Sequence, residues 1–230
     1  MLFGPSVTLP LAAIVAAGSA AALVLHSSHD ETRAPSRHAA HLHASRAAIA
    51  RIGSAQGRAD AVAKHGRAQY RSEVTGSFER STAQHAAGNQ ALRAALRAND
   101  AARARTIATG LLYRRDHISH IEIVRGGRSV VSVGKGFVSG AAPIRVEGDT
   151  MYVSIQDVIG FARLLHRRTG ADVVVRGRRG HVATSLAAAA RASLAARGAT
   201  TIGGVRYHVS SFSATGLLGE RLRVWVLARG

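Results

Sequence analysis

The stretch from residue 152 to residue 176 changes its hydrophobic spacing twice, and this change limits what the chain can fold into. Residues 152–156 form a short β-type run, and residues 172–176 form another. Between them, apolar residues recur at positions i, i+3, i+4 and i+7, namely Val158, Phe161, Ala162 and Leu165. Such spacing places them on one face of a helix. The stretch therefore predicts a strand, a helix and a strand, as in a mixed α and β fold.

Two residues mark the ends of the predicted helix. Asp157 precedes its first turn, where a carboxylate can accept a hydrogen bond from a free backbone N–H. Gly170 follows Thr169, at a point where helices often end in a left-handed residue. The helix is therefore expected between these two positions.

The charge of the chain bears on its partners. The sequence has 31 Lys and Arg residues against 13 Asp and Glu residues, a formal net charge of +18. Such a balance favours anionic partners, namely nucleic acid, anionic lipid or envelope polyanions. Nucleic acid is the least favoured, because only 4% of residues are aromatic and no RNP-like, zinc-finger or helix-turn-helix motif is visible. The absence of cysteine excludes disulfides and thiolate chemistry.

Residues 1–25 are predicted to be a transmembrane anchor or a signal peptide. Leu2–Leu25 carries no charge, and at about 1.5 Å per residue it is long enough to cross a hydrocarbon core of about 30 Å. An uncleaved anchor is favoured, because apolar residues continue beyond the small-residue site at Gly18–Ala20. Residues 26–37 are polar and are predicted to be a linker.

Residues 38–115 are predicted to form a helical arm that packs on a sheet. Apolar residues recur along it at i+4 spacing, at Tyr70, Val74 and Phe78 and again at Leu92 and Leu96. The pattern predicts a long helix broken near Gly76 or Gly88, and then a shorter one. Asn99-Asp100 predicts the start of a further helix over residues 101–113.

Residues 116–230 are predicted to form the core. Gly126-Gly127 separates two β-type runs, residues 118–125 and 128–133, and predicts a tight hairpin. The remaining predicted strands are residues 144–146, 172–176, 181–185, 205–212 and 221–227. Residues 186–197 are rich in alanine and predict a helical turn or a surface excursion.

Three pieces of the sequence carry a resemblance to a known family. They are ALRAALRANDAARARTIATGLLYRRDHISHIEIVRGGRSVVSVG, YVSIQDVIGFARLLHRRTGADVVVR and GGVRYHVSSFSATGLLGERLRVWVLAR. Their order of long helix, Gly-Gly hairpin, internal helix and closing meander resembles the Cache family of PAS-like extracytoplasmic sensor domains. The resemblance covers residues 46–230. It implies an α+β fold in which a long N-terminal helix, preceded by a transmembrane helix, packs on a mostly antiparallel sheet.

The resemblance also implies a function. Members of the family bind a small ligand between the sheet and the loops above it. They usually continue through the membrane to a kinase, cyclase or chemoreceptor module, and no such pattern follows residue 227 in this sequence. We therefore expect a separate signalling partner, with the long helix as a candidate dimer contact. No cofactor is expected.

Six residues are expected around the ligand pocket. They are the polar and aromatic residues Tyr152, Gln156, Asp157, Tyr207, His208 and Arg145. Hydrogen bonds and an aromatic wall could hold a small polar ligand, and arginine could pair with a carboxylate. Arg163 and Arg176 are further candidates for the carboxylate. The alternative is structural, with Asp157 only capping the helix and Tyr207 only filling the core.

Other clusters predict no chemistry. His38, His41 and His43 lie close together, but the only carboxylates nearby are Asp30 and Glu31 in the linker, so a metal site is not predicted. Asp116 lies beside His117 and near His120, but no nucleophile stands at a recognisable spacing. The glycine-rich residues 126–136 lack the Gly-Lys-Ser/Thr of a phosphate loop. The protein is therefore not expected to be an enzyme.

Two functions and two locations stay open at this point. The first function is a membrane-anchored extracytoplasmic module that binds a small ligand, and the alternative is charge-driven binding of a polyanion. Arg33 and Arg37 follow the apolar stretch and favour a cytoplasmic domain, since basic residues tend to stay inside. The family resemblance favours export, which is the location we expect. If the signal is cleaved, the protein is secreted.

Overall fold

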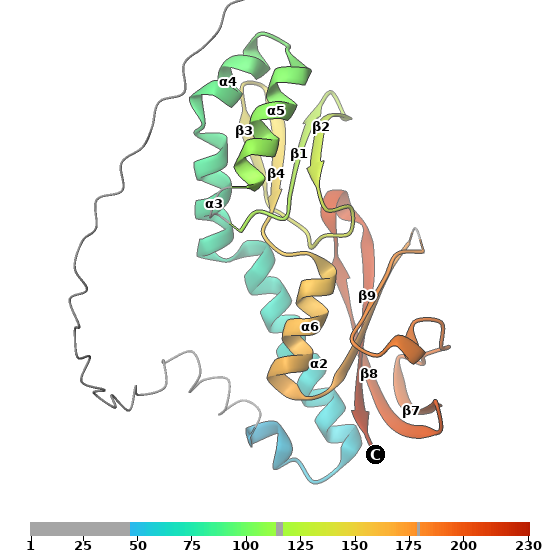
Figure 1. Ribbon diagram of the computed structural model, residues 1–230. Coiled ribbons are helices and arrows are strands. Elements are labelled where there is room, and N and C mark those ends of the chain that lie inside the picture. Colours follow the sequence, from blue (N-terminus) through green and yellow to red (C-terminus); the bar gives the residue numbers. More distant parts are fainter. Residues whose placement is uncertain (1–46, 114–116, 179) are drawn as a thin grey trace, which may run out of the picture. The chain divides into compact units, whose positions relative to one another are not determined.

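The computed structural model describes residues 47–113, 117–178 and 180–230, which form an α+β fold (Figure 1). A long bent helix packs on two antiparallel sheets. The predicted anchor and linker, residues 1–37, lie outside the described residues, as do the histidines at positions 38, 41 and 43. Among the described helices, none is both long enough and apolar enough to span a membrane.

The long helix bends at Gly76. Helix α2 covers Ala55–Thr75 and α3 covers Ser77–Ala87. A Cβ atom on Gly76 would lie 2.2 Å from the carbonyl oxygen of Ser72, which is a backbone atom that cannot turn away. The bend therefore depends on glycine at this position. The predicted break near Gly76 or Gly88 is confirmed at both, because α3 ends just before Gly88.

Two shorter helices follow, each capped by a side chain. Helix α4 covers Gln90–Arg97 and α5 covers Ala101–Leu112. The carboxylate of Asp100 accepts a hydrogen bond from the backbone N–H of Arg103 at 2.9 Å. The predicted helix start at Asn99-Asp100 is therefore confirmed, with Asp100 as the cap.

The first sheet has the strand order β2-β1-β4-β3. Its strands are β1 (His120–Arg125), β2 (Arg128–Gly134), β3 (Pro143–Val146) and β4 (Asp149–Ser154). The predicted hairpin is confirmed, with the backbone of Gly126 and Gly127 at φ values of 54° and 80°. Residues of α3, α4 and α5 share a buried cluster with this sheet, including Leu92, Leu96 and Ile121.

The second sheet has the strand order β6-β5-β9-β8-β7. Its strands are β5 (Asp172–Gly177), β6 (Val182–Thr184), β7 (Arg197–Ile202), β8 (Val205–Thr215) and β9 (Arg221–Arg229). Two short 3-10 helices, Ala187–Ala189 and Leu217–Gly219, lie in its connections. The predicted strands of this half are confirmed. Strand β7 was not predicted, since its sequence RGATTI gives no strong hydrophobic signal.

Helix α6 covers Val158–Thr169 and confirms the predicted strand, helix and strand. Asp157 caps it by accepting a hydrogen bond from the N–H of Gly160, and Gly170 ends it at a φ of 73°. The single sheet expected from the resemblance is wrong, because the flanking strands β4 and β5 belong to two different sheets. The alternation of strand and helix does not specify which strands pair, and α6 packs on β5 and β6 of the second sheet.

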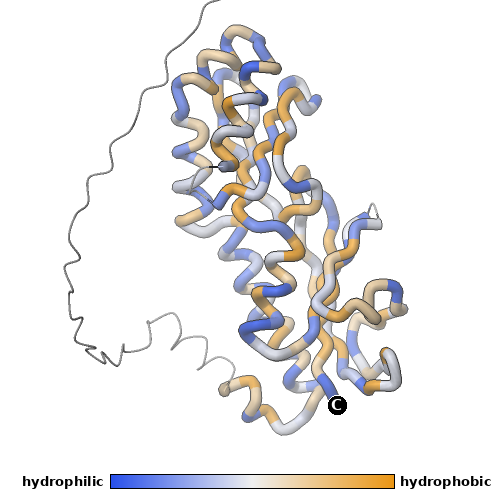
Figure 2. Tube along the Cα trace, viewed as in Figure 1, coloured by the Kyte–Doolittle hydropathy of each residue, from blue (hydrophilic) through white to orange (hydrophobic). Residues whose placement is uncertain are grey.

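Helices α2 and α6 cover one face of the second sheet. Tyr70 of α2 meets Phe161 of α6 edge to face, with ring centroids 5.2 Å apart. Both rings join a buried cluster with Phe212 of β8 and Val224 of β9. Apolar and polar stretches alternate along these helices and strands (Figure 2). The side of α2 that is turned toward the sheet is therefore fixed by apolar packing.

The bend in the long helix gives a first test. Gly76→Ala is expected to destabilise the protein by about 1–3 kcal/mol, because the added Cβ meets the Ser72 carbonyl and strains the backbone. Gly110→Ala is the matched control, because Gly110 lies inside α5 with nothing within 4 Å of an added Cβ. It is expected to stabilise by about 0.5–1 kcal/mol. Urea unfolding of both variants measures this, and equal effects would contradict it.

Candidate functional site

The groove between α2 and β8 brings together arginines and hydroxyl groups. Its volume is about 600 Å³. The described residues that line it are Arg67, Tyr70, Arg71, Val74, Thr75, Ser211, Phe212, Ser213, Thr215 and Arg223. None of these lining residues is Asp or Glu, so the charge of the lining is positive. We call this cavity the arginine groove.

Helix geometry places two of the arginines. Arg67 and Arg71 are four residues apart, so they lie one above the other on the same side of α2. Both are exposed, whereas Tyr70 between them is buried in the core. The guanidinium of Arg67 lies 5.8 Å from the ring centroid of Phe212, within the range of a cation–π interaction. The core residues of α2 and β8 thus set the position of the groove.

The third arginine comes from β9. Arg223 donates hydrogen bonds to the hydroxyl oxygens of Ser211 at 2.8 Å and Ser213 at 3.4 Å. Within the described part of the chain, none of the three groove arginines forms an ion pair. Their charge is therefore available to an anion, which guanidinium groups bind with two parallel hydrogen bonds.

Tyr70 connects the arginine groove to the loop that follows β2. Its hydroxyl donates to the carbonyl oxygen of Thr215 at 2.9 Å and accepts from the N–H of Gly140 at 3.3 Å. Burial raises the pKa of Tyr70, so the hydroxyl stays neutral. Beside this contact, Ser139 forms an isolated β-bridge with Gly216. A movement of α2 at the groove would therefore also displace the loop between β2 and β3 of the first sheet.

The six residues expected around a ligand do not form one site. Arg145 and Tyr152 lie on β3 and β4 of the first sheet, whereas Tyr207 and His208 lie on β8 of the second. Gln156 and Asp157 follow β4 and line a different cavity of about 1020 Å³ together with Phe78 and Tyr113. None of the six is among the lining residues of the arginine groove.

Several of these residues have structural contacts. The ring of Tyr207 is buried in the core on the other face of the second sheet. Asp157 caps α6 and pairs with Lys135. Burial alone would raise the pKa of Asp157, but hydrogen bonds from Lys135 and the Gly160 N–H lower it overall. Arg176 donates to the carbonyl oxygens of Ala189, Ala190 and Ala192, which ties it to the chain after β6.

The arginines of the groove were not singled out by the sequence. Arg67 and Arg71 are spaced like many other arginines of the chain, and Arg223 lies far from them in sequence. A usable signal existed in the i+4 pair beside Tyr70 and Val74, since the apolar stripe of a helix determines which arginines border the sheet. Arg223 of β9 comes to the same groove only through the folding of the chain.

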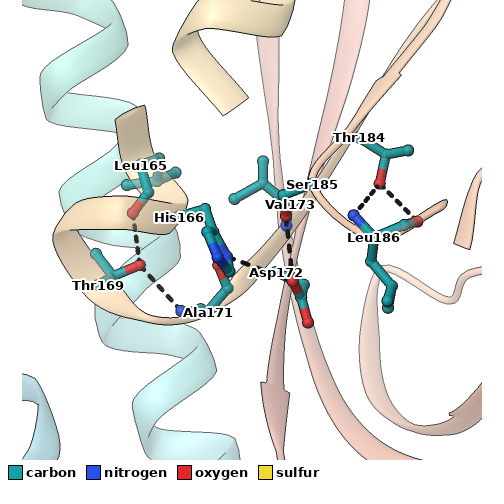
Figure 3. Close-up of polar contacts among 9 residues, drawn as sticks. All are labelled: Leu165, His166, Thr169, Ala171, Asp172, Val173, Thr184, Ser185 and Leu186. Carbon is teal, nitrogen blue, oxygen red and sulfur yellow. Dashed lines mark hydrogen bonds and ion pairs between the residues drawn. The ribbon is translucent and has the colours of Figure 1, made fainter. Parts of the chain in front are cut away.

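A His, Asp and Ser cluster at the end of α6 is structural (Figure 3). The hydroxyl of Ser185 donates to Asp172 at 3.3 Å and accepts from the backbone N–H of Val173 at 2.8 Å. His166 Nδ1 lies 3.3 Å from the same Asp172 oxygen and 3.0 Å from the carbonyl oxygen of Ala171. In a nucleophilic triad the histidine faces the serine hydroxyl. Here both face the carboxylate, which ties α6 to β5 and β6.

His120 is part of a buried pair. Its Nε2 lies 3.0 Å from Glu122, and its Nδ1 lies 2.8 Å from the carbonyl oxygen of Lys135. Burial alone would raise the pKa of Glu122, but hydrogen bonds from Ser129, His120 and Ser132 lower it overall. The carboxylate is thus held ionised inside the first sheet. Asp116, which was expected beside His117, lies outside the described residues.

Glu79 is a second buried carboxyl group, on α3. Its side chain is 1% exposed. One oxygen accepts a weak hydrogen bond from the Ala142 N–H at 3.4 Å, and the other has no partner among the described residues. Burial raises the pKa of Glu79, so the folded protein favours its neutral form.

No family model, curated protein or solved structure matches this chain. The functional assignment therefore depends on the chemistry of the sites themselves. Of the cavities described above, the arginine groove has the most specific chemistry, because it combines uncompensated positive charge with hydroxyl donors.

The two buried glutamates predict opposite responses to pH. The pKa of Glu79 is raised, so its contribution to stability is full below the ordinary glutamate value of about 4.5 and is lost as pH rises through its folded pKa. Glu79→Gln is expected to remove this loss and to be more stable than the wild type at high pH. The pKa of Glu122 is lowered, so its contribution is present at neutral pH and is lost on acidification.

Urea unfolding between about pH 4 and pH 8 measures both effects. Glu122→Gln is the matched control, and it is expected to lower stability at neutral pH, because the His120 ring loses its carboxylate partner. A Glu79→Gln variant that is less stable than the wild type at pH 8 would contradict the assignment.

Proposed function

We propose that this protein is a sensing module that binds a small anionic ligand, carrying carboxylate or phosphate groups, in the arginine groove. One observation carries the proposal: Arg67, Arg71 and Arg223 line a single cavity whose described lining includes no acidic residue. Positive groups gathered in this way, without compensation, raise the local concentration of anions.

The other groups of the groove suit the same ligand. The hydroxyls of Ser213 and Thr215 can donate to oxygen atoms, whereas that of Ser211 already donates to the carbonyl oxygen of Ala196. Phe212 and Tyr70 contribute aromatic surface. The volume of about 600 Å³ lies within the range of small-molecule sites, roughly 300–1,000 Å³. The ligand would therefore be a small organic acid or phosphate ester rather than a bare ion.

The bent helix supplies a route from the groove to the rest of the fold. Helix α2 packs on β8 and β9, and α3, beyond the bend at Gly76, packs on β3 and β4 of the first sheet. Tyr70 adds a direct contact with the loop at Gly140. A ligand that draws α2 closer to β8 would shift both contacts, and a binding protein can shift an equilibrium only through such differential contacts.

The finer expectations from the sequence are part of this proposal. The long helix on antiparallel sheets and the consecutive pairing of β7, β8 and β9 support a Cache-like, PAS-like sensor. We propose that the apolar residues 2–25 anchor it, that the sensor domain lies outside the cytoplasm, and that a separate protein receives the signal. The long helix remains the candidate dimer contact.

The second candidate function is binding of a polyanion. The net charge of +18 supports it, and exposed arginines such as Arg103 and Arg105 lie outside the groove. The two candidates differ in salt dependence, because binding that releases many counterions weakens steeply with salt.

A thermal-shift titration of the full chain in mild detergent tests the ligand proposal. With polyphosphate as the polyanion control, glutarate, succinate and inorganic phosphate are titrated at low and high salt. One of them is expected to raise Tm by roughly 5 °C or more near 100 times its Kd, since binding to the folded state adds about 2.7 kcal/mol there. The double variant Arg67→Gln/Arg71→Gln is expected to bind at least roughly tenfold more weakly.

Arg103→Gln is the matched control, since Arg103 is an exposed arginine on α5. It is expected to leave the titration as it is in the wild type. A different result would favour the polyanion alternative over the small-ligand proposal. In that result only polyphosphate stabilises the protein, the effect fades at high salt, and the double variant and Arg103→Gln weaken it equally.

A further inference from the structure

Among the described residues, no strand lies at the edge of β8 beside the arginine groove. Strand β8 runs from Val205 to Thr215, but β7 pairs with it only as far as Ser210. From Ser211 onward the described chain pairs β8 with β9 on one side only. At the start of this stretch the Ser211 hydroxyl donates to the carbonyl oxygen of Ala196, just before β7, at 2.7 Å. The residues left at the open edge, Ser211, Ser213 and Thr215, also line the groove.

The register shows which backbone groups point into the open edge. The N–H of Gly230 donates to the carbonyl oxygen of Arg206, and the N–H of Gly216 donates to that of Glu220. Both pairs continue the β8–β9 register, in which hydrogen-bonded and non-hydrogen-bonded pairs alternate. Even-numbered residues of β8 therefore bond to β9, and odd-numbered residues direct N–H and C=O away from it.

At the odd-numbered positions the open edge offers unused hydrogen bonds. The carbonyl oxygen of Thr215 accepts a hydrogen bond from the Tyr70 hydroxyl, as expected for a group that points away from β9. The backbone N–H and C=O of Ser211 and Ser213 have no backbone partner among the described residues. Proteins usually blunt such an edge with a charge, a proline or a bulge, or cover it with a helix or loop. Residues 211–215 contain neither charge nor proline, and their register is continuous.

Helix α2 runs alongside this edge. Gln56 near its start donates to the carbonyl of Val209, and Tyr70 near its end reaches Thr215. Between these two contacts the helix advances by fourteen residues, about 21 Å, and the strand by six residues, about 20 Å. The helix and the strand edge therefore run side by side over this length. Arg67 and Arg71 are about 6 Å apart along the helix, close to the spacing of about 6.7 Å between alternate residues of a strand.

We infer that the arginine groove also binds such anionic groups on an extended acidic peptide, which adds to the edge of β8 as a further strand. This inference rests on the proposed function, because the same arginines hold the anionic groups. The peptide backbone would bond to Ser211 and Ser213, and acidic side chains on alternate residues would meet Arg67 and Arg71. Side chains on its other face would meet Arg223. Peptides commonly bind sheet edges in this way, with affinity from the main chain and specificity from alternate side chains.

The test compares peptides that differ only in the backbone. A fluorescein-labelled hexapeptide of alternating glutamate and threonine is titrated into the full chain by fluorescence polarisation. The second peptide has the same sequence with N-methyl groups on alternate residues, which removes hydrogen bonds and keeps the charge. The N-methylated peptide is expected to bind at least roughly tenfold more weakly, since two or more hydrogen bonds are lost.

The matched protein variants are Ser213→Pro and Ser213→Ala. Both lack the hydroxyl, and only proline also lacks the outward N–H, a change that an edge strand tolerates because no bond to β9 is removed. Ser213→Pro is expected to bind the peptide roughly three- to tenfold more weakly than Ser213→Ala. Circular dichroism of both variants verifies that the sheet is intact.

The outcomes separate this inference from the proposed function. Equal binding of the two peptides, with glutarate binding that depends on Arg67 and Arg71, would overturn strand addition and leave the small-anion site. Equal binding of polyphosphate and peptide, the same in both Ser213 variants, would also overturn it, in favour of a polyanion site. If neither peptide nor small anion binds in an arginine-dependent way, both proposals fail.

Discussion

The docking of α2 on β8 and β9 is the contact on which the rest of the structure depends. Val62 and Tyr70 of α2 are buried against Phe212 and Val224, and burial of large apolar side chains of this kind is worth about 1.5–3 kcal/mol each. This packing leaves one side of α2 over the sheet and its flank over the open edge of β8. The apolar packing of α2 therefore fixes the position of the arginine groove, because Arg67 and Arg71 flank the apolar face of the helix.

The same contact joins the two halves of the fold. The connections between the sheets include α6, the bend at Gly76 and the Tyr70 hydroxyl with its bonds to Thr215 and Gly140. Tyr70 belongs at once to the core, to the groove lining and to the link with the first sheet. A ligand beside Tyr70 would thus act on a residue that already bridges the parts of the fold, which is the physical basis for reading the groove as a sensing site.

Local elements could be predicted from the sequence, but their assembly could not. The caps at Asp100 and Asp157 and the hairpin turn at Gly126-Gly127 are set by neighbouring residues, and the structure confirms them. The division into two sheets was missed, because β4 and β5 flank α6 yet pair with strands far away in sequence. The site was missed for the same reason, since Arg223 reaches Arg67 only through the pairing of β8 with β9.

In a chain so rich in arginine, the number of positive charges says little about binding, and the state of each arginine says more. Several described arginines are committed to structure: Arg93 and Arg97 pair with Glu147, Arg125 with Asp149, Arg197 with Asp60. Glu147, Asp149 and Asp60 are thus engaged with these arginines, and Glu79 and Glu122 are buried. An exposed arginine on a convex helix face is simply solvated. Arg67, Arg71 and Arg223 differ because they surround a cavity and an unpaired strand edge, where an anionic chain would find both charge and hydrogen bonds in register.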